Sequence, residues 1–251
     1  MQGAYHGRTI GSLSLTRSKT IYGEGASPVM VRAVPRSPKS PNKLSYQPGT
    51  FVTAFPYWHH FGVPPDTPEA TLVSLALHQL DLLLAQQTGP TETAAIIIEP
   101  VLGEGGYVPA PTSFLSALRA ICDKHGILLI FDEVQSGFGR CGKHFACEWS
   151  GVKPDIMVFA KGIANGFPLS GVVSSQDRMD MMPPGTMGGT YAGNAVSCAA
   201  AIACAEVMEV SQAIDDTSYI TNSVPGGKCP PKCNGEVHGV VYLPTGYARE
   251  P

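Results

Sequence analysis

Four side chains that can act on a small ligand follow long apolar runs of the sequence: Glu99, Asp132, Gln135 and Lys161. Such runs are typical of strands that are buried on both faces of a parallel sheet. Because ligands of these sheets bind beyond the carboxyl ends of the strands, we expect the four side chains to converge at one edge. Two carboxylates, an amide and an amine, with many glycines nearby, predict an active site rather than unrelated strand ends.

This set of groups suits pyridoxal phosphate (PLP). A partly desolvated lysine can form a Schiff base, and a buried carboxylate can keep a heterocyclic nitrogen protonated; PLP needs both. Residues 188–194 read Gly-Gly-Thr-Tyr-Ala-Gly-Asn and precede a predicted helix. Backbone N–H groups and the Thr190 hydroxyl at such a helix start suit a phosphate. The sequence therefore predicts a PLP site.

A nucleotide-binding alternative fails on its required motif. The acidic end of the second apolar run has the form found in P-loop ATPases, which also need a G-x-x-x-x-G-K-[ST] loop. Here Lys143 is followed by His144 and Lys228 by Cys229, where the loop needs serine or threonine. We therefore set this reading aside.

The metal-ligating residue types do not form a predicted metal site. His6 and the pair His59-His60 have no carboxylate at ligand spacing, and Cys229 and Cys233 lack a second pair. The remaining five cysteines are scattered and are predicted to be reduced apolar residues of an intracellular protein: Cys122, Cys141, Cys147, Cys198 and Cys204.

Strands alternate with helices along the chain, which predicts an α/β fold with a mostly parallel central sheet and flanking helices. The predicted strands are 94–98, 127–131, 156–159 and 172–174. Helices are expected over the leucine-rich stretch 72–84, with Thr67 as N-cap and Pro68 at the first position, from Thr112 as N-cap to Gly126, and over 195–210.

Two stretches do not follow this pattern. Residues 33–68 carry eight prolines and are expected to be a long irregular excursion. Residues 211–251 are rich in glycine and proline without useful periodicity, so we expect a poorly ordered tail after a large domain over residues 1–210.

Composition excludes several classes of protein. The chain has 251 residues, a net charge of −3 and 43% hydrophobic residues, enough for a sizeable core and not the basic footprint of a nucleic-acid binder. No stretch reaches the ~18 apolar residues of a membrane span. The N-terminus does not have the form of a signal peptide, so a cytoplasmic location is expected, or a mitochondrial one if a targeting segment was lost.

Five motifs together resemble one family in order and spacing. They are Tyr-His-Gly-Arg-Thr at 5–9, Glu-Pro-Val at 99–101 with Gly-Glu-Gly-Gly at 103–106, Asp-Glu-Val-Gln-Ser-Gly-Phe-Gly-Arg at 132–140, Phe-Ala-Lys-Gly-Ile at 159–163, and 188–194. Over residues 3–210 the chain resembles the class III PLP-dependent aminotransferases, and most of all the 4-aminobutyrate aminotransferase branch. The resemblance implies the large domain of PLP fold type I.

The resemblance assigns the central roles. Lys161 would be the Schiff-base lysine and would move a proton between the substrate and the cofactor. Asp132 would pair with the pyridinium nitrogen, and Gln135 would hydrogen-bond the phenolic oxygen. Tyr5 would stack on one face of the ring and Val134 would pack on the other.

The remaining roles concern the phosphate and the substrate. His6 would lie with the cofactor-binding residues, and Thr190 would reach the phosphate in a neighbouring subunit of a homodimer. Arg8 would bind the distal carboxylate of an ω-amino acid, whose amino group passes to a 2-oxo acid. Glu104 would pair with a second arginine, and Glu99 would shape the substrate pocket.

Family members are longer than this chain. A glycine- and serine-containing phosphate-binding turn is expected before Gln2, and a small C-terminal domain with the second arginine is expected after about Val210. We therefore expect a truncated large domain with an atypical C-terminus and without the small domain. The alternatives left open are a non-catalytic fragment, an acetylornithine or ornithine aminotransferase, and a dialkylglycine decarboxylase of the same family.

Overall fold

The computed structural model describes residues 1–18, 31–35, 44–186 and 188–210, with only the backbone of 31–35 and 44–48. The chain divides into two compact units. The first is Met1–Asp132 with Val152–Ile156, and the second is Glu133–Gly151 with Met157–Pro251. The predicted tail, residues 211–251, lies outside the described residues, so its boundary at residue 210 stays a prediction.

The central sheet has four strands in the order β3-β6-β7-β8. They are β3 (Ala95–Ile98), β6 (Leu128–Asp132), β7 (Ile156–Phe159) and β8 (Gly171–Ser174). Strands β3 and β6 pair in parallel, with Ala95 opposite Leu128 and Ile98 opposite Phe131. All four predicted strands are present within one residue of their expected ends, and the α/β fold class is confirmed.

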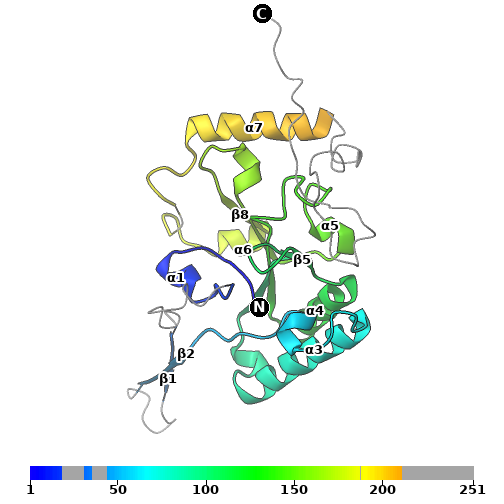
Figure 1. Ribbon diagram of the computed structural model, residues 1–251. Helices are drawn as coiled ribbons and strands as arrows, with labels where there is room; N and C mark the ends of the chain where they lie inside the picture. Colours follow the sequence, from blue (N-terminus) through cyan, green and yellow to red (C-terminus); the bar gives the residue numbers. More distant parts are fainter. Residues whose placement is uncertain (19–30, 36–43, 187, 211–251) are drawn as a thin grey trace, which may run out of the picture. The chain divides into compact units, whose positions relative to one another are not determined.

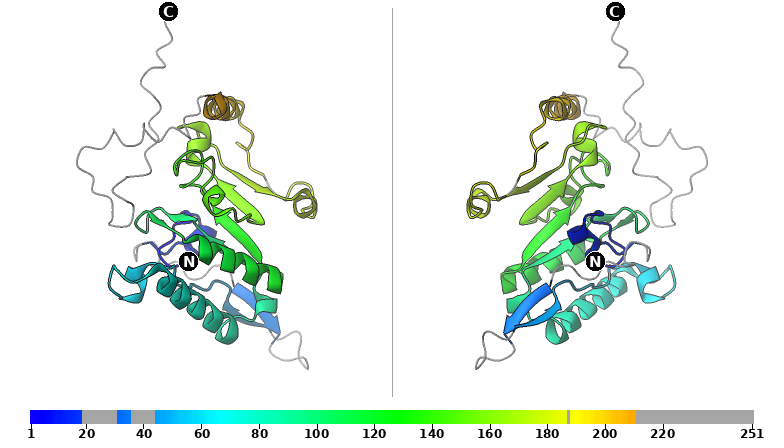
Figure 2. Two further views of the ribbon diagram at one scale, coloured as in Figure 1. Left: turned by 90° about the vertical axis from the view of Figure 1, so that its right-hand side faces the viewer. Right: turned by 90° about the vertical axis from the view of Figure 1, so that its left-hand side faces the viewer.

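In the first unit, two long helices supply much of the core. Helix α3 (Glu69–Gln86) and helix α4 (Thr112–His125) lie side by side in the ribbon views (Figures 1 and 2). Phe114 of α4 is fully buried against the ring of Phe55, at a centroid distance of 6.4 Å. Gly126 ends α4 with a φ of 68°, a left-handed conformation that glycine adopts at no steric cost. This helix end is as predicted.

Both predicted N-caps are displaced by one residue. Pro68 and Pro111 occupy the cap positions, so Glu69 and Thr112 are the first helical residues. The extended ψ of 138° at each proline explains the difference, because it places the proline just outside the helix. The Thr67 hydroxyl donates instead to the Pro64 carbonyl, at 2.6 Å.

The proline-rich excursion contains regular structure that the sequence did not predict. Strands β1 (Val31–Pro35) and β2 (Leu44–Pro48) pair antiparallel, and a short helix α2 spans Trp58–Phe61. Each strand ends on a proline, which cannot continue a ladder as a donor. The prediction of a wholly irregular stretch over 33–68 is therefore wrong.

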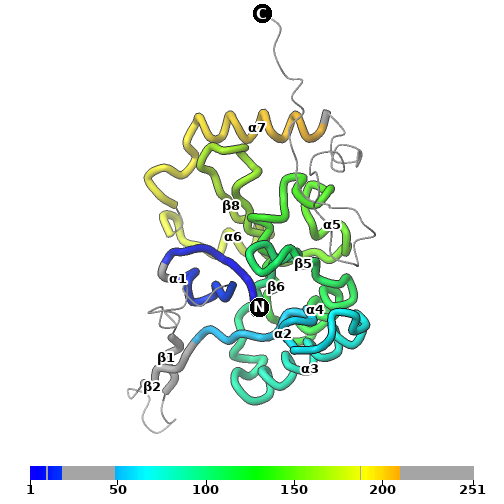
Figure 3. The backbone as a smooth tube through the Cα atoms, in the orientation of Figure 1, coloured from blue at the N-terminus to red at the C-terminus, as the bar shows by residue number. Residues whose placement is uncertain are grey.

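Short elements complete the first unit. Residues 1–18 pass through helix α1 (Ile10–Leu13) and turn back, so that the Arg17 N–H donates to the Ala4 carbonyl at 2.6 Å (Figure 3). A 3-10 helix η2 spans Pro90–Glu92. Strands β4 (Val101–Leu102) and β5 (Val108–Pro109) form a hairpin around the glycine-rich loop.

The second unit carries Lys161, which follows β7 as expected, and the long alanine-rich helix. Its short helices are α5 (Cys147–Ser150), η3 (Lys161–Ala164) and α6 (Gln176–Asp180). Helix α7 spans Ala195–Val210, as predicted, and contacts η3. Among the helices of the described residues, none has the length and apolar character needed to cross a membrane.

Candidate active site

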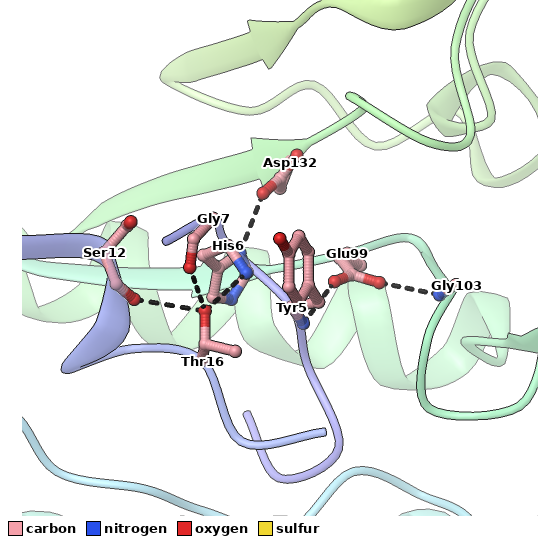
Figure 4. Close-up of polar contacts among 8 residues, drawn as sticks. All are labelled: Tyr5, His6, Gly7, Ser12, Thr16, Glu99, Gly103 and Asp132. Atoms are coloured by element: carbon pink, nitrogen blue, oxygen red, sulfur yellow. Dashed lines mark hydrogen bonds and ion pairs between the residues drawn. The ribbon is translucent and has the colours of Figure 1, made fainter. Parts of the chain in front are cut away.

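A buried carboxylate–imidazole pair marks the end of β6. Asp132 is the last residue of the strand and only 6% exposed. Its Oδ2 lies 2.8 Å from Nδ1 of His6, whose side chain is 2% exposed (Figure 4). The other ring nitrogen of His6, Nε2, is buried without a hydrogen-bond partner. The pair therefore fixes the Asp132 carboxylate and leaves a buried polar atom available to a ligand or a water.

The segment that bears His6 is held by Thr16. The His6 N–H donates to the Thr16 hydroxyl at 3.0 Å, and that hydroxyl donates to the Gly7 carbonyl at 2.9 Å (Figure 4). Thr16 is fully buried. The imidazole is thus presented by a backbone that is tied down next to it.

A second buried carboxylate, Glu99, follows β3. It is 3% exposed, and its two oxygens accept N–H groups from different segments, those of Tyr5 and Gly103, each at 2.7 Å (Figure 4). Burial raises the pKa of the Glu99 carboxyl, although both N–H donors act in the opposite direction. Glu99 therefore ties the 5–9 motif to the glycine-rich loop.

The glycine-rich loop lies directly against the N-terminal segment. A Cβ on Gly105 would be 2.6 Å from the Gly3 carbonyl oxygen, so only glycine fits there without a shift. Glu104, the neighbouring residue, is exposed. The Arg8 guanidinium is also exposed and lies 5.9 Å from the centre of the half-buried Tyr5 ring, within cation–π range.

In the second unit, Lys161 and Gln135 meet. The Lys161 side chain is exposed, which differs from the expectation of a partly desolvated lysine. The Lys161 Nζ donates a hydrogen bond to the Gln135 Oε1. Lys161 is the first residue of η3, and its φ of 48° is in the left-handed region, which is rare outside glycine. Backbone strain of this kind is found at functional sites. Gln135 and Lys161, two of the four residues expected to converge at the strand ends, are thus in direct contact.

The remaining predicted residues lie on the segments expected for them. Val134 follows Asp132 by two positions, and Thr190 is in the turn that precedes α7. That turn ends at Asn194, whose side-chain oxygen accepts the Val196 and Ser197 N–H groups, both at 3.1 Å. Residues 188–194 therefore open a helix, as predicted.

Glu133 was not among the residues predicted for the site. This carboxylate is fully buried between Asp132 and Gln135 and accepts hydrogen bonds from three other residues. The available signal was a second acid at a predicted strand end, followed three residues later by a serine, which is a common spacing for a local side-chain hydrogen bond.

Comparison with known protein families establishes the family to which this chain belongs. The family model described as aminotransferase class-III matches residues 1–224. The chain belongs to the class-III aminotransferases. This is a family of PLP-dependent enzymes, and both the predicted family and the predicted PLP fold type I agree with the match.

Relatives with assigned activities support the same family. The chain is 41% identical over 226 residues to a 5-aminovalerate aminotransferase from Pseudomonas putida, covering 90% of this chain and 47% of the relative. It is 41% identical over 207 residues to a 4-aminobutyrate aminotransferase from Escherichia coli, covering 82% and 42%. The chain thus spans about half the length of the curated relatives it matches.

A solved aminotransferase structure resembles the fold of this chain. The taurine:2-oxoglutarate aminotransferase from Bifidobacterium kashiwanohense, determined in complex with PLP and glutamate, superposes with a TM-score of 0.71 at 32% identity. The match covers 87% of this chain and 46% of that one.

Proposed function

We propose that this chain carries the cofactor lysine of a PLP-dependent aminotransferase that transfers the amino group of an ω-amino acid to a 2-oxo acid. The observation that carries the proposal is the hydrogen bond between Lys161 and Gln135 on a strained turn. Both residues of this hydrogen bond belong to motifs on which the resemblance to the family rests, Gln135 to 132–140 and Lys161 to 159–163. Relatives named for 4-aminobutyrate and 5-aminovalerate support an ω-amino acid with a distal carboxylate as the amino donor.

The residues of the chain fit PLP. A buried carboxylate held by a histidine can pair with a ring nitrogen. The buried His6 Nε2 has no hydrogen-bond partner within the protein, which is consistent with a polar ligand nearby. When bound, PLP supplies an aldehyde that reacts with amines and a ring that withdraws electrons from the substrate. Asp132 would hold the ring nitrogen, Gln135 the phenolic oxygen and Lys161 the aldehyde carbon.

Each of these groups has a defined task. The His6 imidazole keeps the Asp132 carboxylate oriented, and a carboxylate beside a ring nitrogen favours the protonated form of that nitrogen. The Lys161 Nζ is the group that would take the proton from the substrate Cα and return it at the adjacent position. Tyr5 and Val134 would pack against the two ring faces.

The substrate would be recognised by its distal carboxylate. The Arg8 guanidinium can form two parallel hydrogen bonds to a carboxylate, a geometry that lysine cannot provide. Glu104 would pair with a second arginine of the whole enzyme. Glu99 would act through the backbone of Tyr5, which carries the 5–9 motif. In a homodimer, Thr190 would contact the phosphate bound to the partner.

The test is covalent trapping of PLP. The purified chain is mixed with PLP, reduced with borohydride and mapped by peptide mass spectrometry. We expect the label on Lys161, its loss in Lys161→Ala, and no change in Lys153→Ala, which removes an exposed lysine. A label spread over the other lysines as well, or no label at all, would refute the proposal for this chain and favour a non-catalytic fragment.

A chain that passes this test can be assayed for its amino donor. Arg8→Lys should raise the KM for 4-aminobutyrate or 5-aminovalerate by about tenfold or more, since a charged bidentate contact is lost. The KM for a simple amine without a carboxylate should stay unchanged. Equal effects on both donors would exclude Arg8 from carboxylate recognition.

A further inference from the structure

Glu133 joins three separate points of the chain through one carboxylate. Its Oε2 accepts the Ser136 hydroxyl and the Ala146 N–H, the latter at 3.1 Å, and its Oε1 accepts the Cys147 N–H at 2.8 Å. Its own backbone N–H donates to the Val158 carbonyl of β7, at 2.8 Å. Residues 136–146, which we name the 136–146 loop, are therefore closed at both ends by a fully buried side chain.

The 136–146 loop also has internal support. The Phe138 N–H donates to the His144 carbonyl at 2.6 Å, and the rings of Phe138 and Phe145 pack at 5.3 Å between centroids. Phe138 has a φ of 53°, a left-handed conformation that costs energy in a bulky residue. The loop is thus a defined structure whose ends depend on Glu133.

This loop packs on the turn that carries the lysine. The Phe138 ring lies 5.8 Å from that of Phe159, two residues before Lys161. A Cβ on Gly162 would be 2.8 Å from the Phe138 Cβ, so the absence of a side chain at 162 permits the contact. Gln135 lies between Glu133 and the start of the loop, and its amide oxygen is the acceptor for the Lys161 Nζ.

A carboxylate is the side chain that suits this position. All three partners are donors, and a carboxylate offers only acceptors, whereas an amide would turn its NH₂ group toward at least one N–H or O–H. Burial raises the pKa of the Glu133 carboxyl, and the three donors oppose that shift. The hydrogen bonds thus offset the unfavourable burial of the group, and the loop ends are fixed in return.

We propose that Glu133 is a positioning residue for the cofactor lysine: by closing the 136–146 loop it sets Gln135, and through Gln135 it sets the Lys161 amine. This inference rests on the proposed function only for the role of Lys161. The positioning itself is a property of the chain without cofactor.

The test therefore omits PLP. The full chain is treated with a trace of acetic anhydride, and acetylation of Lys161 is measured by mass spectrometry relative to Lys153 in the same molecule; both lysines are exposed. Acylation requires the Lys161 amine to break its hydrogen bond to the side-chain oxygen of Gln135. Gln135→Ala should therefore raise the ratio of Lys161 to Lys153 acetylation about fivefold, which corresponds to a hydrogen bond of ~1 kcal/mol.

Glu133→Gln should raise the ratio by a similar factor, and the double variant with Gln135→Ala should label no faster than Gln135→Ala alone. The matched control is Glu209→Gln, which makes the same change at an exposed acid near the end of helix α7. This control should stay at the wild-type ratio.

Two results would overturn the proposal: a wild-type ratio in Glu133→Gln, or a further increase when Glu133→Gln is added to Gln135→Ala, which would indicate general loosening. If Glu133→Gln does not fold, Ser136→Ala removes one of the three donors and should raise the ratio about twofold; no rise would overturn the proposal equally. A chain that shows this coupling but fails to trap PLP would refute the proposed function alone.

Discussion

Removal of the His6 imidazole tests whether the buried pair at the end of β6 is an energetic unit. The side chains of His6 and Asp132 are 2% and 7% exposed and are 2.8 Å apart. A hydrogen bond to a charged group contributes ~1.5–3 kcal/mol, and loss of one partner leaves the other buried without it. We therefore expect His6→Ala to lower the free energy of unfolding by ~3 kcal/mol, cavity included.

A double-mutant cycle separates the energy of the His6–Asp132 interaction from the cost of the cavity that His6→Ala leaves. In a double-mutant cycle of His6→Ala and Asp132→Ala, we expect an interaction energy of ~2 kcal/mol. Urea unfolding can be followed by tryptophan fluorescence. The chain has two tryptophans, so a Trp149→Phe background leaves Trp58, in the same unit as His6, as the reporter.

The control is His78→Gln, which replaces an exposed imidazole of helix α3 and should change the free energy of unfolding by less than ~0.5 kcal/mol. An interaction energy below ~0.5 kcal/mol in the His6–Asp132 cycle would refute the reasoning, because a buried hydrogen bond to a carboxylate must exceed that value.

Two further predictions concern packing and pH. Gly162→Ala should destabilise the chain by ~1–3 kcal/mol, because its Cβ would be 2.8 Å from the Phe138 Cβ, whereas Gly189→Ala meets nothing within 4 Å and should be nearly neutral in urea unfolding. The pKa of Glu99 is raised on folding from its ordinary value of 4.5, so the folded state binds the proton more tightly and this contribution to stability declines as pH rises through and above 4.5. The stability of the wild type relative to Glu99→Gln, measured in urea at pH 4, 5.5 and 7, should therefore decline with pH; a constant or growing difference would contradict this.

The sequence predicted best the elements whose signal is local. Residues 156–159 and 195–210 have the predicted bounds, because a continuous apolar or alanine-rich run is limited by residues that cannot extend it. The β1–β2 hairpin was missed because it depends on pairing between two stretches that are each short and end in proline. The two helix starts were predicted one residue away from their positions, because a proline at the N-cap and a proline at the first helical position look alike in the sequence.

For the candidate site, the residue types at the strand ends suggested a chemistry, but they did not indicate which side chains are in contact. The residue types at the strand ends indicated Asp132 and Lys161 directly. The partner of Asp132, however, is His6, 126 residues earlier in the chain, and no local pattern reports a contact at that separation. Glu133 was missed for the same reason: the donors Ala146 and Cys147 are backbone groups, which any residue type would provide.

The two successive carboxylates at the end of β6, Asp132 in the strand and Glu133 directly after it, have a consequence for how this gene can change. Along an extended strand, neighbouring side chains point in opposite directions. Here one carboxylate meets an imidazole and the next meets the loop donors. Inserting or deleting a single residue in 128–131 would move both acids by one position, so that at most one of the two present places would still hold an acid. We therefore expect lineages of this protein to vary freely in length within surface loops, but to keep the residue count of this strand fixed even where its apolar residues are replaced.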